Sequence, residues 1–241
     1  MLPRPATNDT RDERSASGGA APPSAAELQL AAAALRRAVT GEGLAVPAGA
    51  VGERLTAYLA LLVRWRRHRR IAGPASPDEL AVEAIVDALF VDEVVPPSGA
   101  LFDVGSGAGL PGIPLALLRE ERFVTLVEPS TARAALLRVA LSTLGLRGRV
   151  VARRAEDLAD DVATGGEAPA DAAVARAFLP PGEWLVLGRR LVRPGGRVIV
   201  LAGRAWPGPS AGSGVTIEGR VDYTLAGRGP RTAWRLSFPR S

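Results

Sequence analysis

The stretch LFDVGSGAGLPGIPLALL, residues 101–118, constrains the fold of this chain more than any other segment. Four glycines lie between an apolar run and a leucine-rich run, so we expect a strand, a tight turn and a helix. Glycines let the backbone of such a turn approach a ligand closely, and the N-terminus of the following helix offers unpaired N–H groups. The segment therefore predicts the ligand-binding turn of an open α/β sheet.

Short apolar runs alternate with helical patterns after this turn. The expected strands are 100–104, 123–128, 149–153, 171–176 and 197–202, and the expected helices between them are 113–119, 131–144 and 182–192. Parallel strands that are joined by helices are buried on both faces, which fits their continuous apolar composition. Near the C-terminus, apolar and polar residues alternate on both sides of 226–231 and predict an antiparallel hairpin. Residues 99–241 should thus form a mostly parallel, seven-stranded α/β domain.

The part of the chain before this domain has a different pattern. Residues 1–26 are rich in Pro, Ser, Ala and Gly and poor in large apolar residues, so we expect a disordered tail. Apolar residues at helical spacing then predict a small N-terminal helical subdomain over 27–98, with helices from Glu27, within 52–70 and over 77–91.

Composition excludes several classes of enzyme. The chain has no cysteine and one histidine, which argues against disulfides, cysteine nucleophiles and bound metal. All 30 of its Lys+Arg residues are arginine, so the lysines of P-loop, pyridoxal and many short-chain dehydrogenase sites are missing. Neither a signal peptide nor an apolar membrane span is recognisable, so we expect a cytoplasmic protein that binds no membrane. The net charge of +5 points to a polyanionic partner.

Two classes of cofactor match the glycine spacing. Residues 107–112 fit the G-x-G-x-x-G loop of dinucleotide-binding proteins, and 103–109 fit the D-x-G-x-G-x-G loop of S-adenosylmethionine (SAM) methyltransferases. Asp103 favours SAM, because a carboxylate at the strand end repels a pyrophosphate but can orient the loop and reach the cationic methionine amine. Glu128 at the end of the second strand suits ribose hydroxyls in either class. A purely structural role of the glycines in a tight turn is a third interpretation.

The continuation L-P-G-I-P-L is far more specific than the glycines that precede it. Together with VTLVEPSTARAALLRVALSTLGL, RRAED (153–157) and ARAF (175–178), it resembles the bacterial 16S rRNA (guanine-N7) methyltransferase G family, RsmG, also called GidB or glucose-inhibited division protein B. The resemblance covers roughly residues 55–202. It implies a Rossmann-like SAM-dependent methyltransferase domain.

The resemblance also implies a reaction and a site. The reaction is methyl transfer from SAM to N7 of guanine 527, in the 530 loop of 16S rRNA, with the rRNA or the small ribosomal subunit as partner; we expect the enzyme to be a monomer. The match places Ala155 and Glu156 on the adenine side, and Arg176 next to cofactor and substrate, where we expect it to be the catalytic residue. The cofactor-binding residues predicted by the loop pattern and the resemblance are Asp103, Gly105, Gly107, Gly109, Leu110, Glu128, Ala155, Glu156 and Arg176.

Chemistry supports a ring nitrogen as the methyl acceptor independently of the family. Guanine N7 carries a free lone pair, so attack on the sulfonium methyl needs alignment and no prior deprotonation. Methylation of pyrimidine carbon 5 uses a cysteine, and methylation of exocyclic amines typically uses [N/D/S]-P-P-[Y/F/W], where this chain has RAFLP over 176–180. Arg176 suits a guanine edge or a phosphate, and Phe178 suits base stacking. A structural ion pair and core packing are the alternatives for these two residues.

The chain departs from the family mainly in its RNA-facing half. The family's W-N-x-x-x-N-L-T is WRRHRRIA over 65–72 here, and of R-H-x-x-D-S only Asp87 is retained. Two family lysines are alanines here, with Arg133 and Arg204 nearby to carry the charge. The basic run RWRRHRR suits rRNA phosphates, with a solvated helix end as the alternative. The expected substrate-binding residues are Arg67, Arg69, Arg133, Phe178 and Arg204.

Three other functions remain open at this point. They are a divergent methyltransferase for another RNA or a small molecule, a noncatalytic RNA-binding relative and a nicotinamide-dependent dehydrogenase, which Asp103 and the missing lysine disfavour.

Overall fold

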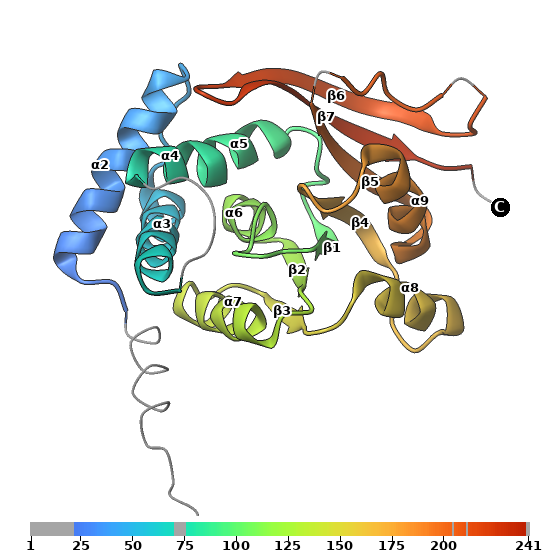
Figure 1. The fold of residues 1–241 in the computed structure, drawn as a ribbon, viewed down its shortest axis with the longest axis horizontal. Helices are drawn as coiled ribbons and strands as arrows, with labels where there is room; N and C mark the ends of the chain where they lie inside the picture. Colours follow the sequence, from blue (N-terminus) through green and yellow to red (C-terminus); the bar gives the residue numbers. More distant parts are fainter. Residues whose placement is uncertain (1–21, 70–75, 204, 211, 240–241) are drawn as a thin grey trace, which may run out of the picture.

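The structure is a computed structural model that describes residues 22–69, 76–203, 205–210 and 212–239. Its centre is a seven-stranded sheet with the order β3-β2-β1-β4-β5-β7-β6 (Figure 1). The first five strands of this order are parallel, and β7 is antiparallel to both β5 and β6. This order confirms the predicted Rossmann-like sheet with a C-terminal antiparallel hairpin. The strands are β1 Gly99–Val104, β2 Arg122–Val127, β3 Gly148–Val151, β4 Ala170–Ala175, β5 Val192–Gly203, β6 Thr216–Leu225 and β7 Gly229–Ser237.

The carboxyl ends of the central strands meet at one edge of the sheet. In the parallel register, Val104 of β1 lies beside Val127 of β2 on one side and Ala175 of β4 on the other. The chain leaves β1 toward β2 and β3 and later returns to the opposite side of β1 as β4. The loops after β1 and β4 therefore flank the topological switch point, where open α/β sheets bind their ligands.

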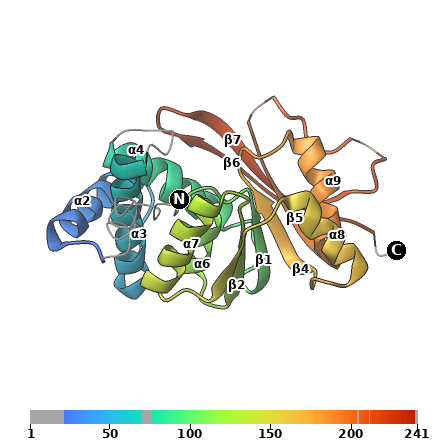
Figure 2. The same cartoon turned by 60° about the horizontal axis from the view of Figure 1, so that its bottom comes forward.

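Helices cover both faces of the sheet because the side chains of each strand alternate between two hydrophobic clusters. Leu101 and Ile199 belong to the cluster that includes residues of α6, α7 and the N-terminal helices, whereas Phe102 and Val200 belong to the cluster that includes residues of α8 and α9. Figure 2 shows these two groups of helices on opposite sides of the sheet. The helices are α2 Ala25–Gly41, α3 Gly49–Arg69, α4 Pro77–Ala81, α5 Asp87–Val91, α6 Gly112–Leu118, α7 Thr131–Thr143, α8 Ala155–Thr164 and α9 Pro181–Leu191. In the described part of the chain, no helix has the length and apolar composition needed to cross a membrane.

The N-terminal helices share one continuous hydrophobic cluster with the sheet. Helix α2 begins at Ala25, two residues before the predicted start, because Ser24 and Glu27 form a capping box. Glu27 also accepts a hydrogen bond from Arg64 Nη2 at 2.6 Å, which ties α2 to α3. This bond lowers the pKa of Glu27 to about 2.

The helical segment predicted over 77–91 has those two ends in the structure, but it is not a regular α-helix. Between α4 and α5 it contains a π-helical turn, η1 Val82–Val86. Helix α8 lies between β3 and β4 and was absent from the expected elements, and β5 starts five residues before its predicted start at 197.

Candidate functional site

The loop between β1 and α6 contains three glycines in the left-handed region, with φ of 68° at Gly105, 57° at Gly107 and 97° at Gly109. A Cβ atom at Gly105 would lie 2.7 Å from Phe178 Cδ2, and one at Gly109 would collide with Ile113. At Gly107 the nearest heavy atom would be a backbone oxygen at 3.8 Å. Packing therefore requires glycine at the first and third positions, while the second faces open space.

Two buried carboxylates hold this loop. Glu128 Oε2 accepts a hydrogen bond from Gly107 N–H at 2.9 Å, and its Oε1 accepts one from Ser130 N–H at 2.9 Å. Asp103 Oδ2 accepts one from Gly112 N–H at 3.2 Å, whereas its Oδ1 has no hydrogen-bond partner among the described residues. Burial raises the pKa of Asp103 to about 7.

These features fit SAM better than a dinucleotide. An unpaired carboxylate oxygen beneath the loop suits a ligand that carries a cation and opposes one that carries a pyrophosphate. The open space over Gly107 allows a ligand to approach the backbone directly. Glu128 uses one lone pair of Oε2 for Gly107 of the loop and one of Oε1 for Ser130, so its carboxylate retains acceptor capacity for hydroxyl groups.

A cavity of about 260 Å³ opens beside the loop. Of the residues predicted from sequence, it brings together Gly105, Gly107, Leu110, Arg133 and Arg176. The remaining lining residues are Leu62, Arg66, Leu80, Glu83, Ser106, Ala108 and Ala177. A larger cavity of about 610 Å³ lies between α2 and α3, away from the loop, and its lining is mostly apolar.

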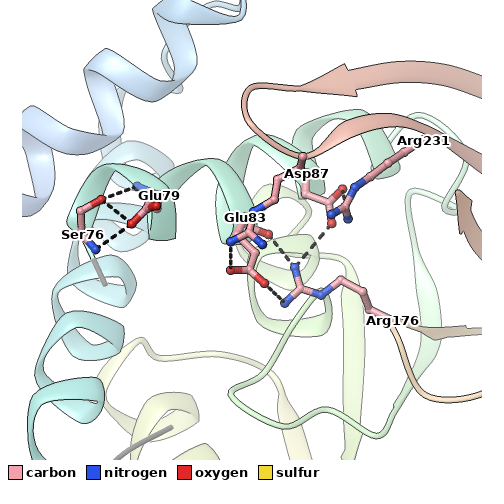
Figure 3. A network of polar contacts seen from close by, with 7 residues as sticks. Ser76, Glu79, Glu83, Asp87, Arg176 and Arg231 are labelled. Atoms are coloured by element: carbon pink, nitrogen blue, oxygen red, sulfur yellow. Dashed lines mark hydrogen bonds and ion pairs between the residues drawn. The ribbon is translucent and has the colours of Figure 1, made fainter. Parts of the chain in front are cut away.

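Arg176 follows β4 and connects this cavity to the N-terminal helices (Figure 3). Its Nη1 donates a hydrogen bond to the Glu83 carbonyl oxygen at 2.6 Å and lies 3.6 Å from Asp87 Oδ2. Asp87 Oδ1 accepts a hydrogen bond from the Tyr223 hydroxyl at 2.7 Å and lies 3.7 Å from Arg231 Nη1. Arg176 thus takes part in an ion-pair network and also lines the cavity.

Other predicted residues, Ala155, Glu156 and Phe178 among them, do not line the cavity. Ala155 is buried and Glu156 exposed in the first turn of α8. The Phe178 ring packs over Gly105 and meets Trp184 edge-on, with 6.4 Å between ring centroids, so base stacking by Phe178 stays a prediction.

Three of the predicted rRNA contacts cannot be placed. Arg67 and Arg69 belong to the last turn of α3, but their side chains lie outside the described residues, as does the whole of Arg204.

Tyr58 and Glu83 hold the glycine loop or Arg176 but were not predicted as site residues, and Asp87 was noted only as a retained family residue. The Tyr58 hydroxyl donates a hydrogen bond to the Ala108 carbonyl oxygen at 2.9 Å, which anchors the glycine loop to α3. Burial raises the pKa of Tyr58 and keeps it a donor. Glu83 of η1 and Asp87, the first residue of α5, form ion pairs with Arg176. Tyr58 falls within the helix predicted inside 52–70, and the one available signal for its contact is a ring with a hydroxyl group among apolar residues.

In the described part of the chain, no three His, Cys, Asp or Glu side chains lie close enough together to hold a metal ion.

Comparisons with known proteins agree with this geometry. The family model described as "rRNA small subunit methyltransferase G" matches residues 52–206. A ribosomal RNA small subunit methyltransferase G from Anaeromyxobacter dehalogenans is 36% identical over 197 residues, 80% of this chain and 90% of that protein. One from Xanthomonas axonopodis is 38% identical over 172 residues, 71% of this chain and 76% of that protein.

A solved structure shows the fold alone. A Listeria monocytogenes protein described as a class I SAM-dependent methyltransferase superposes with a TM-score of 0.55 and 12% identity, covering 82% of this chain and 71% of that one. The segment matched by the family model includes the glycine loop, both buried carboxylates and Arg176, and it ends before the C-terminal hairpin.

Proposed function

The chain belongs to the rRNA small subunit methyltransferase G family, and from this membership we propose that it transfers the methyl group of SAM to N7 of guanine 527 in the 530 loop of 16S rRNA. The family supports an rRNA methyltransferase as the enzyme class and SAM as the cofactor. We further propose that it acts as a monomer in the cytoplasm, on rRNA or the small ribosomal subunit.

The main support for the proposal is that the glycine loop and Arg176 line the same cavity at the switch point of the sheet. The loop offers backbone groups and open space over Gly107. Two further arginines, Arg66 and Arg133, line the same cavity and suit an RNA substrate.

We assign the cofactor-binding role to the loop residues Gly105, Gly107 and Leu110, to the carboxylates of Asp103 and Glu128, and to the first turn of α8. When bound, SAM supplies an electrophilic methyl group on a sulfonium. Asp103 lies beneath the loop and balances the positive charge of this ligand. The Glu128 carboxylate holds the loop in position and accepts hydrogen bonds from the ribose hydroxyls.

The protein has to align N7 of the guanine with the methyl group of SAM. Arg176 is suited to donate to guanine O6, which holds the base while N7 remains accessible. Because N7 already carries a lone pair, no side chain has to remove a proton, and the cavity needs no general base. The absence of cysteine from the chain agrees with this chemistry.

The test is transfer of a radiolabelled methyl group from SAM to 30S subunits isolated from cells that lack the gene, alongside calorimetric titrations with SAM and with NAD. The proposal expects SAM binding, no NAD binding and stoichiometric methylation. Arg176→Ala should lose most of the transfer, and Arg176→Lys should recover only part of it because an ammonium lacks the planar two-pronged donor. Arg190→Ala is the matched control, since Arg190 pairs with Asp160 on the outer helices.

Three results would refute these assignments or change the proposed function. Transfer by Arg176→Ala at the parental rate would remove Arg176 from the active site. SAM binding without transfer to any RNA would favour a noncatalytic RNA-binding relative. Transfer to another RNA instead would favour a divergent methyltransferase, which the changed residues over 65–72 would then explain.

A further inference from the structure

The π-turn over Val82–Val86 frees one backbone acceptor of its helix. Asp87 N–H donates to the Val82 carbonyl, five residues back, whereas a regular α-helix would pair it with the Glu83 carbonyl, four residues back. The Glu83 carbonyl accepts a hydrogen bond from Arg176 Nη1 at 2.6 Å. The irregular turn therefore gives an arginine of the cavity a backbone acceptor that a regular helix would not offer.

The same turn brings a buried carboxylate to Arg176. The Asp87 residue is 1% exposed, and a charge at such a depth is costly unless it is paired. Arg176 Nη1 lies 3.6 Å from Asp87 Oδ2, an oxygen that lacks a hydrogen-bond partner among the described residues. Its other oxygen, Oδ1, faces Tyr223 and Arg231 of the C-terminal hairpin. Asp87 is thus the shared acid between an arginine of the cavity and an arginine of the hairpin (Figure 3).

We propose that Asp87 and the Glu83 carbonyl position Arg176, holding its guanidinium in the cavity beside the glycine loop. A backbone acceptor and a buried carboxylate on one helical segment restrict the rotation of a long side chain that would otherwise sample many rotamers. Arg231 and the Tyr223 hydroxyl hold Asp87 in turn, so the hairpin, which lies beyond the segment matched by the family model, contributes to the geometry of the cavity.

This inference rests on the proposed function, because Arg176 is its working group. A purely structural network would predict a different outcome: loss of the Asp87 charge would loosen the hairpin and lower stability, but the reaction rate of the folded protein would not change.

A double-mutant cycle with Asp87→Asn and Arg176→Lys separates the two roles. Asn retains an acceptor for the Tyr223 hydroxyl but removes the buried charge that faces Arg176, while the Glu83 carboxylate, 3.7 Å from Arg176 Nη2, stays in place. Asp87→Asn should lower kcat for 16S rRNA methylation by about 10- to 100-fold, the loss expected from a misplaced catalytic group, with a smaller change in KM. In the Arg176→Lys background the same substitution should cause almost no further loss.

Asp92→Asn is the matched control. Asp92 follows the same helical segment and pairs with the buried Arg122 at 2.5 Å, but neither residue lines the cavity. This variant should be less stable than the parent and retain the parental kcat. Tyr223→Phe, which leaves the Asp87 charge in place, should reduce kcat less than Asp87→Asn does.

A second readout does not depend on activity. In the ¹H–¹⁵N spectrum of the parent, the Arg176 guanidinium signal, assigned by its loss in Arg176→Lys, should show hindered rotation. Asp87→Asn should turn it into an averaged signal, and Asp92→Asn should leave it unchanged.

Four outcomes would overturn the inference or its premise. Parental kcat in Asp87→Asn, or additive losses in the cycle, would refute the positioning role while the proposed function stands. A freely rotating Arg176 in the parent would refute it as well. A parent chain that shows the hindered signal but methylates no 16S rRNA would refute the proposed function alone. The fixed position of Arg176 would then stand as a structural finding.

Discussion

Replacement of Glu128 tests how the fold supports the cofactor loop. Glu128 is 3% exposed, and each of its oxygens accepts one backbone hydrogen bond at 2.9 Å, from Gly107 and from Ser130. Glu128→Ala leaves both N–H groups without an acceptor, and each such loss costs about 1–3 kcal/mol. The free energy of unfolding should therefore fall by about 2–6 kcal/mol. Glu128→Gln keeps one acceptor oxygen but turns an amide NH₂ toward the other N–H, so it should lose about half as much.

The same substitution should weaken SAM binding. Loss of hydrogen bonds to a charged group costs about 1.5–3 kcal/mol, which corresponds to roughly 10- to 150-fold in the dissociation constant. Urea unfolding gives the stability change, and calorimetric titration with SAM at a temperature where every variant is folded gives the affinity change. Glu93→Ala, which removes an exposed carboxylate elsewhere, is the control. Parental stability in Glu128→Ala would refute the view that this carboxylate holds the loop, and parental SAM affinity would remove it from the site.

Three further predictions concern other charges of the chain. Asp92→Ala should lower the free energy of unfolding by about 3–5 kcal/mol in urea denaturation, because it leaves the buried Arg122 guanidinium without its carboxylate; a loss below about 1 kcal/mol would contradict the pairing. Burial raises the pKa of Asp103 to about 7 in the folded state, above its value near 4 in the unfolded chain. The stability that protonated Asp103 contributes is therefore fully present below pH 4 and is lost as the pH rises through 7. In thermal unfolding, the stability of Asp103→Asn should consequently fall less between pH 4 and 7 than the stability of the parent does. Parallel curves of stability against pH for the two proteins would refute the raised pKa of Asp103. Replacing Arg67 and Arg69 together should weaken binding to 16S rRNA and leave SAM affinity unchanged. The slope of log K against log salt should become shallower by about 2, and a parental slope would mean that the basic run RWRRHRR is only a solvated helix end.

Local patterns predicted most of the sheet. The alternation in 215–225 and 232–238 identified the β6–β7 hairpin, and the second half of β6 does alternate between more buried and exposed residues. Strand β7 is instead covered on both faces, since Ala233 belongs to one hydrophobic cluster and Trp234 to the other. Helix α8 was missed although Leu158 and Ala159 are buried on one side of it, because the residues RRAED at its start were interpreted only as a motif. Its amphipathic period was visible in the sequence.

The residues of the candidate site were harder to predict from the sequence than the fold was. The glycines and the two acids could be assigned because their spacing fixes their places around one turn. The contacts of Asp87 could not, since an extra residue in the π-turn shifts the face that each later side chain presents, and no residue type marks such a turn. The pairing of Asp87 with Tyr223 and Arg231 also joins parts of the chain that are more than 130 residues apart.

The central claim is that this chain methylates one ring nitrogen in 16S rRNA. The most direct measurement is to map N7-methylguanine, by chemical cleavage at modified guanines, in 16S rRNA from cells with the gene, without it, and with the Arg176→Ala variant in its place. A single modification at guanine 527 of the 530 loop, absent without the gene and strongly reduced in the variant, is the predicted result. An unchanged pattern of 16S rRNA methylation in cells that lack the gene would contradict the claim.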